Sequence, residues 1–212
     1  MEKKIDYHLK SMNEIERIAK AMVKPRLLLH SCCAPCSTYT LLFLCPVFAV
    51  TIYFNNSNIY PASEYQKRLS ELQRFLEAFE EKSHHHVDLI VPRYDNDAYN
   101  LDLEPYADLP EGSKRCLLCY EKRMDEAYRY AQSNGYDYFT TSMTISRQKN
   151  SQILNAIGQK LAFLYPKTKY FYSDFKKDRG IDIAREMRDE YGLYQQLYCG
   201  CKYSFLRRNS TK

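Results

Sequence analysis

The chain has 212 residues, of which 45% are hydrophobic, and no stretch rich in proline, glycine or serine divides it. A chain of this length can bury one sizeable core, so we expect a single domain over residues 1–212. No apolar run reaches the roughly 20 residues that span a bilayer, and the first ten residues lack the apolar centre of a signal peptide. We therefore expect a cytoplasmic protein without membrane contact. The net charge of +5 permits nucleic-acid binding but does not establish it.

Helix and strand signals alternate along the chain. Apolar residues at helical spacing in 13–22 predict an N-terminal helix within residues 1–24, which must end at Lys24-Pro25. The same spacing predicts later helices over 37–44, 61–79, 116–134, 153–164 and 183–191, with Pro61 at the first position of the second. Runs of leucine, β-branched and aromatic residues predict five strands, at 26–31, 47–55, 87–91, 136–141 and 169–172.

This alternation predicts an α/β fold, in which an open parallel sheet of about five strands carries helices on both faces. Ligands of such sheets bind outside the carboxyl ends of the strands. Two segments lie outside the alternation. Residues 93–115 show no period and are rich in Asp, Asn, Pro and Gly, which predicts a long functional loop. Residues 194–212 form a cysteine-containing C-terminal segment.

Seven of the eight cysteines fall in three motifs, which are Cys32-Cys33-x-x-Cys36, Cys116-x-x-Cys119 and Cys199-x-Cys201. The first two motifs stand where a helix begins, so free backbone N–H groups and the helix dipole favour ionised thiols there. Eight cysteines in a reducing compartment indicate metal or redox chemistry. Cys45, beside Pro46, is the exception, and we expect it to be a packing residue.

Three chemistries can use such thiols. A structural zinc site would take four of them, but 79 residues separate the two Cys-x-x-Cys pairs (116 − 36 − 1), far more than the roughly 15 to 20 of a zinc ribbon. A disulfide reductase needs one Cys-x-x-Cys pair and leaves five thiols without a role. An iron-sulfur cluster, with further thiols for a second metal, accounts for all seven. A tRNA-binding module with zinc and a cysteine-pair reductase remain the alternatives.

The chain also resembles the QueH-type epoxyqueuosine reductases between about Leu27 and Ser204. The resemblance rests on five motifs, which are His30-Ser-Cys-Cys-Ala-Pro-Cys36, Asn55-Asn-Ser-Asn-Ile-Tyr-Pro61 with Glu64-Tyr65, Arg115-Cys-x-x-Cys-Tyr120, Asp174-Phe-Lys-Lys177 with Gly180, and Tyr194-Gln-x-x-Tyr-Cys-Gly-Cys201. One departure is Asn56-Ser-Asn-Ile59, where the family has Asn-Pro-Asn-Ile; it changes the stiffness of one loop.

The resemblance implies reduction of epoxyqueuosine to queuosine at the wobble position of a tRNA anticodon, the last step of queuosine synthesis. It implies a [4Fe-4S] cluster, a second iron ion and a HUP-like sheet related to PP-loop ATPases. The ATPase nucleotide loop is replaced by Cys-Cys-Ala-Pro-Cys, so we expect no use of ATP. The electron donor is unknown. The candidate proton donors or substrate contacts are Tyr198, Lys177 and Asp174.

We expect tRNA phosphates to be bound by a subset of nine cations, which are Arg68, Lys114, Arg115, Arg147, Lys149, Lys176, Lys177, Arg207 and Arg208. We also expect the seven motif cysteines to divide, with three or four binding the cluster and the remainder a second metal. Because neighbouring side chains point in different directions, we expect Cys32 and Cys33 to serve different centres. Cys199 and Cys201 can reach both.

Overall fold

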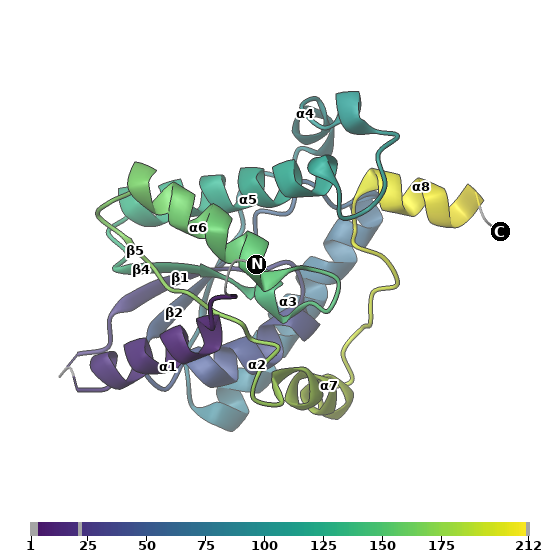
Figure 1. Ribbon diagram of the computed structural model, residues 1–212. Coiled ribbons are helices and arrows are strands. Elements are labelled where there is room, and N and C mark those ends of the chain that lie inside the picture. Colours follow the sequence, from purple (N-terminus) through teal and green to yellow (C-terminus); the bar gives the residue numbers. More distant parts are fainter. Residues whose placement is uncertain (1–3, 21–22, 211–212) are drawn as a thin grey trace.

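A computed structural model describes residues 4–20 and 23–210 (Figure 1). The strands are β1 (Arg26–His30), β2 (Ala49–Tyr53), β3 (Asp88–Ile90), β4 (Tyr138–Thr141) and β5 (Lys169–Tyr170). The helices are α1 (Tyr7–Ile18), α2 (Ala34–Leu44), α3 (Ala62–Ser83), α4 (Asn96–Asn100), α5 (Lys114–Ser133), α6 (Ser151–Leu164), α7 (Gly180–Glu190) and α8 (Lys202–Ser210), with short 3-10 helices η1 (Glu104–Tyr106) and η2 (Ser142–Ile145). Among the described residues, no helix is both long and apolar enough to cross a membrane.

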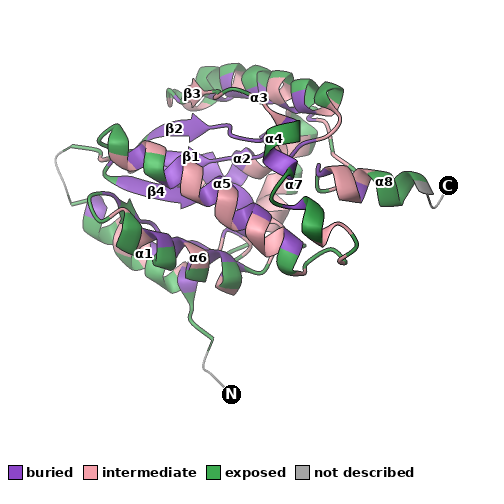
Figure 2. Ribbon diagram, turned by 90° about the horizontal axis from the view of Figure 1, so that it is seen from above, coloured by how far each residue is buried: buried purple, intermediate pink, exposed green. Residues whose placement is uncertain are grey.

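The five strands form one sheet in the order β3-β2-β1-β4-β5, and every pair is parallel. The central strand β1 sets Leu28 opposite Thr51 of β2 and Phe139 of β4. The predicted open parallel sheet with helices on both faces is therefore confirmed. Because all strands run the same way, their carboxyl ends share one edge; Figure 2 shows β2 and β4 pointing toward the end of the molecule that carries α8.

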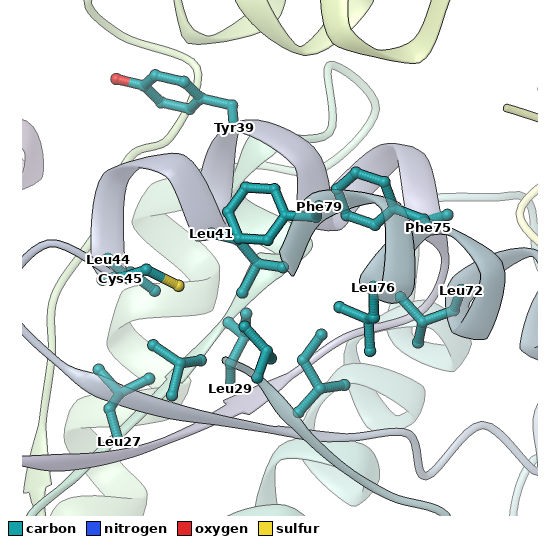
Figure 3. Close-up of a cluster of buried hydrophobic side chains, with 14 of the residues drawn as sticks. Leu27, Leu29, Tyr39, Leu41, Leu44, Cys45, Leu72, Phe75, Leu76 and Phe79 are labelled. Carbon is teal, nitrogen blue, oxygen red and sulfur yellow. The ribbon is translucent and has the colours of Figure 1, made fainter. Parts of the chain in front are cut away.

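Alternate residues of β1 supply the two halves of the core. Leu27 and Leu29 pack with residues of α2, α3 and α7 on one face, whereas Leu28 packs with α5 and α6 on the other. Figure 3 shows the first half, in which Leu41 of α2 and Phe75 and Phe79 of α3 lie over Leu29. Cys45 is 2% exposed and belongs to this cluster. Its predicted role as a packing residue is thus confirmed.

Some predicted boundaries were wrong. The N-terminal helix begins at Tyr7 rather than Asn13, because the Asp6 side chain accepts a hydrogen bond from the Leu9 N–H and caps the helix there. Its predicted end at residues 21–22 lies outside the described residues. Pro61 is the N-cap of α3 and not its first helical residue. The strands are shorter than predicted by up to four residues, as at β2.

Two segments contain helices that periodicity did not predict. The expected loop at 93–115 holds α4 and η1, and the Asp95 carboxylate caps α4 by accepting from the Ala98 N–H. The C-terminal segment holds α8. Helices this short show too few turns for an apolar period to be recognised. Both lie at the edge where the strands end.

Helix α1 is joined to the opposite, amino-terminal edge of the sheet through Glu14. Its carboxylate accepts hydrogen bonds from Tyr138 at the start of β4 and from Lys169 of β5, and it pairs with Arg17. Burial alone would raise the pKa of Glu14, but these donors outweigh it and lower that pKa to about 2.

We predict that Glu14→Gln lowers the free energy of unfolding by ~1 to 2 kcal/mol at pH 7, after allowance for partial exposure. A carboxyl group whose pKa is lowered by folding stabilises the protein above its unfolded pKa, and this stabilisation is lost as the pH falls toward the folded value. The difference between wild type and variant should therefore shrink from pH 7 to pH 3 in urea unfolding curves. Glu16→Gln, on an exposed position of the same helix, is the control. A difference that did not change with pH would contradict the assignment.

Candidate metal centre

The first cysteine motif forms the turn between β1 and α2. Cys33 is the N-cap of α2 in an extended conformation, and Cys36 lies in the first turn. Buried hydrogen bonds fix this turn: the Ser37 hydroxyl donates to the Cys33 carbonyl at 3.0 Å, and the Asn56 amide donates to the Ser31 carbonyl at 2.7 Å. The turn is thus held from both its own helix and the loop after β2.

The sulfurs of Cys32, Cys33 and Cys36 all lie within 4.8 Å of one another. The sulfurs of Cys32 and Cys33 are 3.7 Å apart. The prediction that these neighbours point in different directions was wrong, because their sulfurs come within hydrogen-bonding distance in the turn at the start of α2. Hydrogen bonds from Cys33 and Cys36 lower the pKa of Cys32, and the same contact raises the pKa of Cys33 to about 12. Contacts with Cys32 and Cys33, together with burial, also raise the pKa of Cys36. The expectation that thiols at this helix start ionise more easily therefore holds for Cys32 and not for Cys33 or Cys36.

The other two motifs meet beside α5. Cys116 and Cys119 lie in its first two turns, and the thiols of Cys199 and Cys119 both act on Cys116 and raise its pKa, after the larger effect of burial. Burial likewise raises the pKa of Cys201 to about 12, with further contributions from Cys199 and Cys119. Cys199 is exposed and the other three are buried or half-buried. We call these four thiols the second group. Among the described residues, only the sulfurs of the first motif all lie close enough together to hold one metal ion.

Both groups face one cavity of about 760 Å³, which we call the cysteine cavity. Five cysteines line it, which are Cys32, Cys36, Cys116, Cys199 and Cys201. Cys33 and Cys119 stand behind them, and each accepts a hydrogen bond on sulfur: from the Gln196 amide at 2.9 Å and from the Tyr99 hydroxyl at 3.3 Å. Gathered thiolates with donors to their sulfurs are the ligand set of iron-sulfur clusters. The residues present therefore fit such a group.

The C-terminal segment is held at this cavity by a buried arginine of α3. Arg68 of α3 is 2% exposed, pairs with Glu64 at 2.7 Å, and donates to the carbonyls of Tyr198 and Cys199, each at 3.2 Å. Next to these, the Tyr60 N–H donates to the Gly200 carbonyl at 2.7 Å. Gly200 has φ +110°, and a Cβ there would lie 2.9 Å from the guanidinium. The glycine is required by this close approach.

Two of the nine cations in the predicted phosphate-binding set are buried. Arg68 binds the C-terminal segment and also lines the cysteine cavity, and Arg115, also 2% exposed, donates to three carbonyls of the loop before α5. Both guanidinium groups already hydrogen-bond to main-chain carbonyls, which leaves them fewer N–H groups for RNA phosphates. Lys176 is similarly engaged, with Nζ 2.7 Å from the Thr144 carbonyl and 3.2 Å from the Asp174 carboxylate. The remaining predicted cations are Lys114, Arg147, Lys149, Lys177, Arg207 and Arg208.

One residue that sequence reasoning missed is Arg123, which is 2% exposed and stands behind the second group of thiols. It donates to the Cys119 carbonyl at 3.3 Å. Burial alone would lower its pKa, but the thiolates of Cys119, Cys199 and Cys32 together raise it. Lys149 in the cavity wall behaves in the same way, because Cys199 and Cys32 outweigh its burial and raise its pKa. The signal for Arg123 was its position one helical turn after Cys119.

The three candidate catalytic residues are placed differently. Tyr198 lines the cysteine cavity, and its hydroxyl donates to the Tyr60 carbonyl. Asp174 accepts from the Ser151 hydroxyl at 2.8 Å and is absent from the cavity wall, as is the exposed Lys177. Catalytic roles for all three stay predictions, and only Tyr198 lies beside the thiols.

Comparison with known proteins gives three kinds of likeness. A family model described as epoxyqueuosine reductase QueH matches residues 27–207. Relatives named epoxyqueuosine reductase QueH include one from Streptococcus pyogenes serotype M1, 40% identical over 202 residues (95% of this chain, 78% of the relative), and one from Staphylococcus aureus, 38% identical over 207 residues (97% and 86%). The fold matches that of the U34-tRNA thiolase NcsA from Methanococcus maripaludis, solved with its [4Fe-4S] cluster, with TM-score 0.52 and 15% identity over 96% of this chain and 70% of that one. The chain belongs to the QueH family of epoxyqueuosine reductases.

Proposed function

We propose that this protein reduces the epoxide of epoxyqueuosine in the anticodon of a tRNA to the alkene of queuosine. The observation that carries the proposal is the convergence of cysteines from three distant parts of the chain, with five lining one cavity and Cys33 and Cys119 beside them. Neither a zinc site, which takes four thiolates, nor a disulfide reductase, which takes two, requires this arrangement. The family membership supplies the substrate.

The reaction removes the epoxide oxygen as water, and it consumes two electrons and two protons. The [4Fe-4S] cluster would supply electrons one at a time, and a second iron would stabilise the developing alkoxide as a Lewis acid. The chain's own task is to hold the nucleoside in the cysteine cavity and to deliver protons there. We propose that no ATP is required, since cysteines occupy the loop in which related ATPases bind nucleotide.

The division of the thiols follows their grouping. We propose that Cys32, Cys33 and Cys36 hold one metal centre and that the four thiols of α5 and the C-terminal segment hold the other. The 4.8 Å separation within the first group and the mutual electrostatic effects within the second support this division. It replaces the expectation that adjacent cysteines serve different centres.

Tyr198 is the proton donor that we propose. Burial, followed by the Glu64 carboxylate, raises the pKa of its phenol. A phenol with a raised pKa stays protonated through neutral pH, so it can donate to an alkoxide oxygen. In the structure this hydroxyl donates its single proton to the Tyr60 carbonyl, so it must turn from that carbonyl to the substrate oxygen when it acts as the donor.

We predict that protein purified without oxygen is brown, contains iron and acid-labile sulfide, and turns over epoxyqueuosine-containing tRNA in the absence of ATP. Exposure to air should bleach it and abolish turnover, because the cavity opens to solvent at Cys199. Iron, sulfide and zinc analysis together with the visible spectrum checks this. Colourless, zinc-loaded protein with full activity would overturn the proposal.

Single Cys→Ser variants should separate the two centres. Variants of Cys32, Cys33 and Cys36 should share one pattern of metal loss, and variants of Cys116, Cys119, Cys199 and Cys201 should share another, with sulfide lost in only one of the groups. All seven should lose turnover. Cys45→Ser is the matched control, and we expect full metal content with only a modest loss of stability. Identical loss of all metal in all seven variants would refute the division.

Tyr198→Phe should lower kcat by about 10²-fold, the usual contribution of a general acid, while iron and sulfide contents stay at the wild-type level. Tyr194→Phe is the control, because its hydroxyl contacts Glu64 at 3.2 Å and does not line the cavity. Single-turnover rates with the reduced protein isolate the chemical step. If both variants reacted at the wild-type rate, Tyr198 would not be the donor.

A further inference from the structure

A second cavity of about 360 Å³ adjoins the cysteine cavity. It lies between α7 and the turn after η2, and the two cavities share wall residues from three segments, which are Cys36, Ser146, Gln148, Gln195 and Gln196. A molecule bound in the cysteine cavity can therefore extend directly into the second cavity. Cys36 lines both cavities, so one thiol of the proposed metal centre forms part of the shared wall.

Three arginines give this second cavity its charge. Arg147 comes from the turn after η2, and Arg185 and Arg188 lie one turn apart on α7. No acidic side chain is among the residues that line the cavity in the described part of the chain. We call it the arginine cavity. Its cations face a single concave space, which is the arrangement that binds an anionic group by several guanidinium contacts.

The nearby carboxylates neutralise these arginines only in part. Arg188 pairs with Asp189 at 2.6 Å and also donates to Gln195 at 2.6 Å. Arg185 has a long contact of 3.4 Å with Asp182, and both side chains are exposed. Arg147 is exposed and has no hydrogen bond or ion pair with any residue of the described chain. At least one guanidinium is thus free to bind an incoming anion.

Part of the remaining wall is apolar. Pro35, Ile145, Ile181 and Ala184 line the same cavity. A site that combines an apolar wall, amide side chains and guanidinium groups suits an unstacked nucleotide: the base can stack or pack against the wall while the phosphate contacts arginine.

We propose that the arginine cavity holds a nucleotide that flanks the modified nucleoside in the anticodon loop, with its phosphate bound by Arg147, Arg185 and Arg188. This inference rests on the proposed function, because it takes the modified nucleoside to occupy the cysteine cavity. Splaying one flanking nucleotide into the second cavity would keep the loop open while the nucleoside reaches the thiols. It would also select RNA over the free nucleoside.

The first test measures binding of a synthetic anticodon stem-loop to anaerobically purified protein. Arg147→Gln, Arg185→Gln and Arg188→Gln should each raise Kd, and the triple variant should raise it by about tenfold. The triple variant should also make the slope of log K against log salt shallower by about 0.7, the value for one single-strand phosphate. Arg129→Gln is the matched control, because this arginine is exposed on α5 and lines neither cavity. Its Kd and salt slope should equal those of the wild type. Iron and sulfide contents of each variant verify that the metal centre is intact.

The second test changes the RNA instead. Replacing one loop phosphate at a time by a neutral methylphosphonate should identify a single position, next to the modified nucleoside, where wild-type binding weakens by about tenfold. In the triple variant Arg147→Gln/Arg185→Gln/Arg188→Gln the same replacement should weaken binding little further, because the contacts with that phosphate are already absent. The proposal would be overturned if each methylphosphonate weakened RNA binding by the same factor in the wild type and in the variant, whichever phosphate was replaced.

Failure of this inference is distinguishable from failure of the proposed function. If the wild type reduces epoxyqueuosine in tRNA but the three arginine variants bind the stem-loop as tightly as the wild type, only the inference fails. If those variants bind RNA normally but accept electrons more slowly from a reduced acidic donor protein, the cavity serves that donor and the inference is overturned. If the wild type binds the stem-loop with the predicted arginine dependence but does not reduce it, the reaction is wrong and the binding site stands.

Discussion

The cysteine site depends on the contacts of one buried guanidinium group, that of Arg68. A charged group removed from water destabilises a protein unless it is paired and fully hydrogen-bonded. Glu64 supplies the pairing carboxylate, and the carbonyls of Tyr198 and Cys199 accept from the remaining N–H groups. Arg68 obtains these two carbonyl acceptors only when the C-terminal segment lies on α3. The same packing holds Cys199 and Cys201 at the carboxyl edge of the strands.

The thiols at this edge must lose their protons to bind metal, and two effects oppose that. Burial and then neighbouring thiols raise the pKa values of Cys116 and Cys201. Arg123 behind the thiols and Lys149 in the cavity wall act in the opposite sense, because they bring positive charge to both groups of sulfurs. The cations therefore help to keep the site assembled and shape the field that a bound cluster would experience.

The site also shows how a parallel sheet serves a large substrate. The turns after β1 and β4 lie at one edge, where such sheets bind ligands. Here the loop before α5 and the C-terminal segment extend this edge into two adjoining cavities, one lined by sulfur and one by arginine. The first has the ligands for redox metals, and the second has the cations for a phosphate. Because Cys36 lines both cavities, the proposed phosphate site lies directly beside the proposed metal site.

The sequence by itself determined the sheet, most of the helices and the seven cysteines, because apolar periodicity and Cys-x-x-Cys spacing are local properties. It did not predict α8, and it misplaced Arg68 and Arg115 on the surface, because the sequence around an arginine does not show whether carbonyls from another segment will surround it. It also predicted that Cys32 and Cys33 point apart, whereas the turn at the start of α2 brings their sulfurs to 3.7 Å. Only the tertiary structure decided these points, since contacts between residues up to 131 positions apart are set by how the chain packs.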